Sequence, residues 1–554
     1  MQGETQLQLR RRRLNDLAQE AQDFEVSFKE LSTYINPKRG EFGEARVRRG
    51  QMINHKILLD DHATHSCRIL ASGLNSGITS KSRPWFRLTL ADHDQEDLPG
   101  VRLWLDEVQR RMYLVLEKSN MYSIFQSAYE ELGTFGTACY VMLPDFTDVI
   151  RGRSFTAGQY YLGTDEKGRV NCFGRKYYMK VVQMVDEFGV ENCSPQVRAD
   201  FENNKPDNYY QVSHLIEPND KRNPAYKDRL NMPFRSCYWE TNGSEEKFLA
   251  KRGFQIFPVV APRWETITTD TVYGYGPGWY ALGNIKQLQK TVKDKLLAQE
   301  KAHNPPMQED ASIEGASSYI PGGITKSSST VPNAGVRPAY QITGNLESLI
   351  ESITTLKDSI DRSYYVNLFM MLAGLDGKGR TATEIAERQQ EKIMMMGPIL
   401  HKLDEEMLTQ TLELEFHYIS QAGGFPPPPQ NIAGSEIKIQ YISILAQAQK
   451  ALGVTQVERV LGIVGGISGL YPEAPDNFNI DETVRGIAEM EGIPAKFMSN
   501  RDDMAQLREH RAKMEQAAQA AQYAGSAADT TKKLADSPMD QNSALDKLVA
   551  GVPQ

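Results

Sequence analysis

Hydrophobic and polar positions follow two different periods along this chain, and the change of period divides the sequence. Helical patterns cover residues 5–35, 52–74 and 97–132, which predicts helices in the N-terminal part. From there to about residue 265, short runs of aromatic and β-branched residues alternate with turn residues, which predicts strands. Helical patterns then return. The chain is therefore predicted to be α+β and mainly helical.

The predicted strands are short, and turn residues bound them. A hairpin turn is expected at Asp165–Gly168 and a second one around Asn242-Gly243. The strands are predicted at 139–143, 155–162, 170–178, 209–216, 237–241 and 247–250, with an extended segment at 257–264.

Residues 274–367 form the most informative unit of the pattern. Two amphipathic segments, 278–303 and 346–367, flank a stretch rich in Pro, Gly and Ser. An out-and-back helix pair with a small insert cannot bury its own apolar positions, so each helix needs neighbours on both sides. This geometry favours a ring of subunits around a channel over a self-contained enzyme.

The residues just before the first of these helices predict a turn that launches it. They are Gly274, Gly276, Pro277 and Gly278. The stretch resembles a phosphate-binding loop only superficially, because it lacks both the GxGxxG spacing and a GK[ST] ending. Proline and glycine at such positions are typical of a helix start.

Beyond the pair, a glycine-rich loop at 371–380 precedes a helix that we expect to run from Thr381 towards Ile419, with a kink at Gly397-Pro398. The proline-rich segment 423–429 predicts an extended linker. Residues 437–520 return to a helical pattern. Gly525, Ser526 and Pro538 then break it, which predicts a flexible tail over 525–554.

Composition limits the class of protein. A chain of 554 residues should divide into several domains, and 24% charged with 40% apolar residues is typical of a soluble globular protein. No run of eighteen apolar residues is present, so no membrane partner is expected, and the N-terminus has no signal-peptide pattern. The 5 cysteines include no CxxC pair, which favours free thiols in a reducing compartment.

The sequence offers little that indicates catalysis. His62 and His65 have a spacing that could hold a metal on one helix face, but no third ligand accompanies them and HExxH is absent. Neither GxSxG nor GxxxxGK[ST] occurs. We therefore predict no enzyme activity, no metal and no cofactor. A metal-dependent hydrolase that takes a ligand from elsewhere in the chain stays open as an alternative.

Weak contact with nucleic acid is possible. A net charge of −8 argues against tight, sequence-specific DNA binding but permits a channel in which DNA slides. Lys286, Lys290 and Lys293 share one face of the first helix of the pair. Lys378 and Arg380 lie in the glycine-rich loop, where they could contact phosphates without reading sequence. A solvated helix face and an ordinary surface loop are the alternative interpretations.

Several blocks of the chain, in this order, resemble the head-to-tail connecting (portal) proteins of podovirus-type bacteriophages. The resemblance covers residues 8–520. The blocks are 129–140, 158–165 with Gly168, Phe173 and Arg175, 258–263, 273–282, 381–385, 440–449 and 480–488. Each block is short and carries no catalytic chemistry, but their joint order is specific.

The resemblance implies a ring, a homododecamer, at one vertex of the virion capsid, assembled in the bacterial cytoplasm. Its regions would be a wing at 1–277, a stem at 278–303 and 346–370, a clip at 304–345, a channel loop at 371–381, a wing return helix with its linker at 382–436, a crown at 437–524 and the tail at 525–554. The family has a long C-terminal barrel helix, which we expect to be short here because of the break at Gly525.

The resemblance also implies partners. Such a ring conducts double-stranded DNA during packaging and ejection, while a separate terminase hydrolyses the ATP. Its partners would be the terminase large subunit, a tail adaptor or head-completion protein, the major capsid and scaffolding proteins, and internal core or ejection proteins. A different structural protein of a phage head or tail remains the second alternative.

Overall fold

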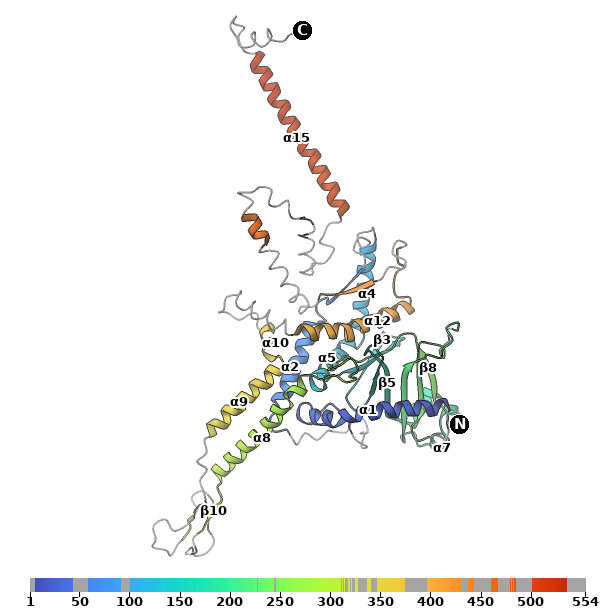
Figure 1. Ribbon diagram of the computed structural model, residues 1–554, viewed down its shortest axis with the longest axis vertical. Coiled ribbons are helices and arrows are strands. Elements are labelled where there is room, and N and C mark those ends of the chain that lie inside the picture. Colours follow the sequence, from blue (N-terminus) through green and yellow to red (C-terminus); the bar gives the residue numbers. More distant parts are fainter. Residues whose placement is uncertain are drawn as a thin grey trace.

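A pair of helices leaves the body of the protein and carries a two-stranded sheet near its tip (Figure 1). The computed structural model describes residues 5–42, 58–90, 100–309 apart from 227, 244 and 245, scattered positions from 311 to 339, and residues 346–373, 396–429, 437–442, 460–466, 479, 481, 483–484 and 501–535. Over these residues, no helix combines the length and the apolar character needed to cross a membrane.

Helices build the N-terminal part of the body. They are α1 (Gln6–Tyr34), α2 (His62–Gly77), α4 (Val101–Lys118) and α5 (Met121–Phe135). The helix predicted over 5–35 is confirmed. The single helix predicted over 97–132 is wrong, because the extended backbone of Ser119 (φ −76°, ψ 176°) separates α4 from α5. The helix predicted from residue 52 begins only at His62 in the described residues, and residues 52–57 lie outside them.

The β-rich part folds into two antiparallel sheets, with strand orders β3–β2–β9 and β4–β5–β6–β7–β8. The strands are β2 (Cys139–Asp145), β3 (Val149–Phe155), β4 (Tyr161–Thr164), β5 (Val170–Lys180), β6 (Tyr209–Pro218), β7 (Phe234–Glu240), β8 (Ala250–Phe254) and β9 (Val259–Val260). The two predicted hairpins are confirmed by the β4–β5 and β7–β8 pairings. The single strand predicted over 155–162 is wrong, because the chain turns at Gly158, whose φ is +88°.

Helices cover both faces of the larger sheet, and alternation along β6 explains how. Leu215 belongs to a cluster with Leu14 and Leu17 of α1, whereas Val212 packs in a cluster with Met184 and Val197 on the other side. The second cluster involves α6 (Val181–Phe188) and α7 (Pro195–Glu202), which are joined through the 3₁₀ turn η1 (Val190–Asn192). The sequence pattern did not predict these short helices.

The projecting arm consists of α8 (Pro277–His303), which runs outward, and α9 (Leu346–Ser363), which returns (Figure 1). Near the tip, β10 (Met307–Gln308) pairs antiparallel with β11 (Arg337–Pro338). The returning helix was predicted as one element to residue 367, which is wrong. Tyr365 has a left-handed backbone (φ 55°), and the helix resumes as α10 (Val366–Ala373).

After residue 395 the described chain re-enters the body as a helix. This helix passes through the π-helical turn η2 (Asp404–Thr409) and continues as α12 (Gln410–Gln421). The start predicted at Thr381 lies outside the described residues. Residues 437–441 were predicted to be helical, but they form β12 (Ile437–Tyr441), which pairs antiparallel with β1 (Phe86–Leu90).

The long helix α15 (Arg501–Ala535) lies at the end of the molecule opposite the arm (Figure 1). It continues through Gly525 and Ser526, so the break and the short helix predicted there are wrong. One glycine costs a helix only about 1 kcal/mol, and the surrounding alanines are the strongest helix formers. Residues 536–554, including Pro538, lie outside the described residues.

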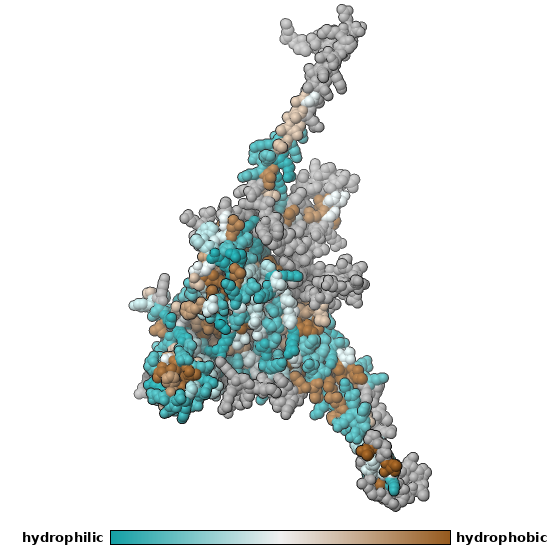
Figure 2. All heavy atoms as spheres, turned by 180° about the vertical axis from the view of Figure 1, so that it is seen from behind, coloured by the Kyte–Doolittle hydropathy of each residue, from teal (hydrophilic) through white to brown (hydrophobic). Residues whose placement is uncertain are grey.

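One hydrophobic core joins the base of the arm to the body. Ile285 and Leu288 of α8, Ile360 of α9, Leu70 of α2 and Phe125 of α5 all belong to it. Farther out the arm loses this cover, and Leu296, Leu297 and Ile350 are exposed by 48%, 42% and 52%. Figure 2 shows hydrophobic residues along the surface of the arm.

Candidate functional site

The turn before α8 packs backbone against backbone on the C-terminal end of α5. Gly276 is the N-cap and Pro277 the first residue of the helix, and the backbone of Gly276 is extended (φ −135°, ψ −177°). A Cβ at Gly276 would lie 2.6 Å from the carbonyl oxygen of Leu132, and one at Gly278 would lie 2.4 Å from that of Thr134. Lack of space, rather than backbone conformation, therefore requires glycine at these positions.

Hydrogen bonds strengthen the same junction. The amide of Gly274 donates to Thr137 Oγ1 over 2.7 Å, and Trp279 Nε1 donates to the carbonyl oxygen of Phe135 over 2.7 Å. A Cβ at Gly274 would lie 2.5 Å from the carbonyl oxygen of Gly136. The body thus fixes the direction in which α8 leaves it.

The segment just before α2 holds both helices of the arm. Gln289 of α8 accepts hydrogen bonds from the amides of Leu59 (2.8 Å) and Asp60 (3.1 Å), and its Nε2 donates to the Asp60 carbonyl (2.6 Å). The Asp60 carboxylate pairs with Lys357 of α9 over 2.7 Å. Burial would raise the pKa of Asp60, but hydrogen bonds from Lys357 and the His62 amide outweigh it and lower that pKa.

A second contact between α2 and α9 involves a histidine that the sequence had offered as a metal ligand. His62 Nε2 lies 3.0 Å from Asp361 Oδ1, and Ser66 donates to the same oxygen over 2.7 Å. His65 is exposed. In the described part of the chain, no group of three or more His, Cys, Asp or Glu side chains could hold a metal ion. Within the described residues, the alternative of a metal-dependent hydrolase therefore finds no third ligand to join His62 and His65.

The three lysines predicted to share a face of α8 have different surroundings. Lys286 forms an ion pair with Glu30 of α1 over 2.7 Å and lies 5.7 Å from the centre of the Tyr34 ring. Lys290 and Lys293 lie farther along the helix, are exposed, and have no ion pair with any described residue. Lys378 and Arg380 lie outside the described residues, as does the loop 374–380.

Sequence reasoning missed the polar residues that hold the arm. These are ordinary polar residues in helical patterns: Gln289, Asp60, Lys357 and Asp361. Their partners can lie far away in the sequence, since Ser66 and Asp361 are separated by 295 positions. Gln289 offered a local signal, because it is an uncharged polar residue within the apolar stripe of an amphipathic helix. In the structure its side chain is 7% exposed, and a buried amide of this kind needs a hydrogen-bond partner.

Comparison with known proteins gives consistent matches over the chain. The family described as "Bacteriophage head to tail connecting protein" matches residues 7–498. A probable portal protein of Bordetella phage BPP-1 is 36% identical over 546 residues, which cover 98% of both chains. The portal protein of Salmonella phage epsilon15 is 36% identical over 555 residues, covering 100% of both.

Proposed function

The chain belongs to the family of bacteriophage head-to-tail connecting proteins, and from this premise we propose that copies of it form the portal ring at one vertex of a phage capsid. This ring conducts double-stranded DNA during packaging and ejection, and it docks the terminase and the tail adaptor. The observation that carries the proposal is the match to two portal proteins over 98–100% of their length.

The arm supports assembly with copies on both sides. Its base is enclosed by the body, whereas Leu296, Leu297 and Ile350 farther out expose 42–52% of their surface. Among the described residues, no third element of the arm covers these side chains. In a ring, the arms of neighbouring copies supply the missing apolar contacts, each of which contributes about 25 cal/mol per Å² of buried apolar area.

The proposed division into regions is based on the arm and on the family. We assign the arm helices to the stem and the residues between them, 304–345, to the clip that meets terminase and adaptor. Residues 1–277 and the helix ending at Gln421 form the wing, and residues 437–524 the crown. The helix α15 is exposed over residues 506–521, which fits a bundle of such helices from neighbouring copies.

The proposed path of DNA uses cations of α8 that have no ion pair among the described residues, together with two cations predicted from the sequence. Lys290 and Lys293 are available on α8, whereas Lys286 is already paired with Glu30. Lys378 and Arg380, predicted to lie in a loop after the arm, would add to them. Repeated around the ring, these cations would form rings of positive charge in a protein whose net charge per chain is −8. Such rings hold phosphates weakly and without regard to sequence.

Electron microscopy of the purified protein tests the ring. We expect closed rings with a central hole, and native mass measurement gives the number of copies, for which the family suggests twelve. The double variant Leu297→Asp/Ile350→Asp should fail to close rings, because it places carboxylates in the contact between arms. Leu230→Asp is the matched control, since Leu230 is 57% exposed but lies outside the arm. Rings of normal yield from the arm variant would contradict the proposed contact.

In-vitro packaging tests the DNA path. The charge reversal Lys378→Glu/Arg380→Glu, and separately Lys290→Glu/Lys293→Glu, should reduce packaged or retained DNA while rings still form. Lys118→Glu/Arg222→Glu is the control, because it also reverses two cations, here at exposed positions of the body. Normal packaging and retention in both reversal variants would refute the assigned contacts.

A further inference from the structure

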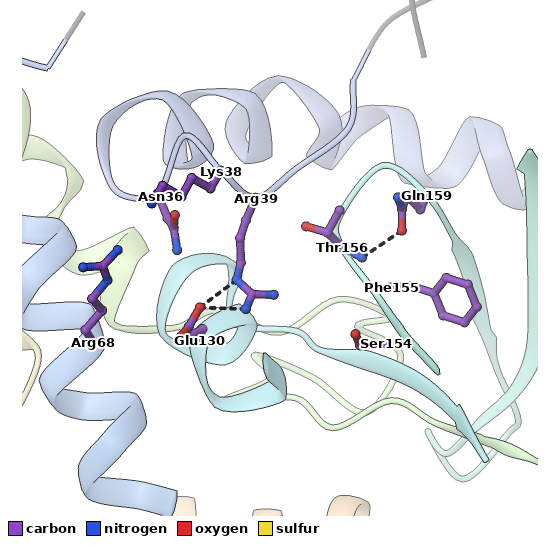
Figure 3. A pocket seen from close by; sticks show the side chains of 9 residues that line it. All are labelled: Asn36, Lys38, Arg39, Arg68, Glu130, Ser154, Phe155, Thr156 and Gln159. Atoms are coloured by element: carbon purple, nitrogen blue, oxygen red, sulfur yellow. Dashed lines mark hydrogen bonds and ion pairs between the residues drawn. The ribbon is translucent and has the colours of Figure 1, made fainter. Parts of the chain in front are cut away.

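A cavity of about 380 Å³ opens where the end of α1, the helices α2 and α5, and the end of β3 meet (Figure 3). It lies apart from the arm contacts described above. Its lining is mostly polar and carries more positive than negative side chains. The lining residues are Asn36, Lys38, Arg39, Arg68, Glu130, Ser154, Phe155, Thr156 and Gln159.

Arg39 lines the cavity and pairs with two carboxylates. Its guanidinium contacts Glu130 over 2.6 Å and the buried Glu131 over 3.0 Å. Burial raises the pKa of Glu131, although the charge of Arg39 and its hydrogen bonds oppose the rise. One guanidinium faces two carboxylates here, so the three lining cations exceed the acids Glu130 and Glu131 by one positive charge.

Two of the lining cations have no partner among the residues that the structure describes. Lys38 follows α1, Arg68 lies on α2, and both are exposed. Neither forms an ion pair or a side-chain hydrogen bond with any residue in the described ranges. Two unpaired cations beside one cavity repel each other, and an anion between them would turn this repulsion into attraction.

Neutral donors face the same space. Asn36 is only 6% exposed, yet its side-chain amide makes no hydrogen bond to the described part of the protein. The amide atoms of Asn36 keep some accessible surface, so they can reach a ligand in the cavity. In Figure 3 the side chains of Asn36 and Arg68 extend from their two elements into the cavity region, while the Phe155 ring points away from the Arg39–Glu130 pair. The Ser154 hydroxyl on β3 is likewise without a hydrogen-bond partner among the described residues.

We propose that this cavity is a binding site for an oxyanion, a phosphate or carboxylate group held by Lys38 and Arg68 with the Asn36 amide as donor. Charge-assisted hydrogen bonds from ammonium and guanidinium groups are the strong ones for such ligands. The oxyanion comes either from free phosphate or from a carboxylate side chain of a second copy. Backbone phosphates of a DNA duplex fit poorly, because a stiff duplex presents them on a broad rod rather than inside a cavity between elements.

Calorimetry and thermal unfolding with inorganic phosphate, compared with chloride at equal ionic strength, test the site. We expect saturable binding and a rise in Tm for the unaltered protein. Lys38→Gln/Arg68→Gln should weaken phosphate binding about tenfold or more, in line with the loss of two charge-assisted contacts. Asn36→Asp, which keeps the size but places a carboxylate in the cavity, should abolish it.

The matched control is Lys118→Gln/Arg222→Gln, which removes two exposed cations outside the cavity and should bind phosphate as the unaltered protein does. An equal response of the cavity and control variants, or no response beyond that to chloride, would overturn the proposal.

Comparing monomers with assembled rings separates the two sources of the oxyanion. If a second copy supplies the carboxylate, phosphate binds only the monomer and competes with ring formation; if the ligand is free phosphate, monomer and ring bind it equally. The inference does not rest on the proposed portal function, because phosphate binding by monomers can be measured even if no ring forms.

Discussion

Replacing Gly276 by alanine tests whether the turn before α8 fixes the arm to the body. The backbone of Gly276 is extended, which any residue adopts, so alanine adds no conformational strain. The conflict is purely one of space, because the new Cβ would lie 2.6 Å from the Leu132 oxygen and 2.7 Å from the Gly136 Cα. Both neighbours are backbone atoms, and neither can turn away as a flexible side chain would.

The cost follows from the contacts that must open. Overpacking of this kind costs about 1–3 kcal/mol. If α8 retreats from α5 instead, the hydrogen bonds from Gly274 to Thr137 and from Trp279 to Phe135 lengthen from 2.7 Å, at about 1 kcal/mol each. Alanine also has less conformational freedom than glycine in the unfolded chain, which offsets about 0.4–1 kcal/mol of this cost. By either route, we therefore expect Gly276→Ala to lower the free energy of unfolding by about 1–2 kcal/mol.

Urea denaturation followed by fluorescence measures this, and α8 supplies a matched control. A Cβ at Gly283 would meet nothing within 4 Å, so Gly283→Ala should stabilise the protein by about 0.5–1 kcal/mol through helix propensity. The two variants make the same chemical change on one helix and should shift the urea midpoint in opposite directions. A midpoint for Gly276→Ala at or above that of the unaltered protein would refute the reasoning.

Three further predictions concern the body. Arg263→Met breaks a buried ion pair with Glu406 (2.6 Å) and should lower the free energy of unfolding by about 3–5 kcal/mol. Glu117→Gln, in an exposed pair with Lys81, should lower it by less than about 0.5 kcal/mol. Equal urea midpoints for the two variants would contradict this. Burial raises the pKa of Glu415, whose carboxylate oxygens have no hydrogen-bond partner in the described part of the chain. The stability that this group contributes is therefore greatest below the unfolded carboxyl pKa and is lost as pH rises. Glu415→Met should therefore raise Tm more at pH 8 than at pH 5, and a pH-independent change would exclude this cause. Val149→Asn should raise Tm by removing strain of about 1 kcal/mol, because Val149 has a φ of 69°, and a lower Tm would show that packing of the valine prevails.

Elements with a strong local cause were predictable from the sequence. Proline and glycine around residue 277 indicated the start of α8, and the structure begins that helix at Pro277. The breaks at Ser119 and Tyr365 were not predictable, because neither residue is a helix breaker and the apolar periodicity continues across both. The strand β12 also depends on tertiary context, since its partner β1 lies about 350 residues earlier in the chain.

The candidate site was predictable only in outline. A helix pair that cannot bury itself is visible in the periodicity, but the contacts that hold it depend on where α2 lies. Lys286 shows the limit most clearly. Its spacing groups it with Lys290 and Lys293, yet its distance of 2.7 Å to Glu30 commits it to the body. A pattern of charges along a helix cannot distinguish a cation that faces another element from one that faces solvent.

The distribution of contacts along the arm explains why Lys286 contacts the body while Lys290 and Lys293 do not. Every polar contact described here between the arm and the body, from Glu30 and Asp60 to Asp361, lies near its base. Farther out, Leu296, Leu297 and Ile350 are exposed, as are the cations Lys290 and Lys293. An arm held firmly at its base and left bare farther out can be positioned before neighbours arrive. In the proposed ring, contacts with neighbouring copies would complete its remaining surface.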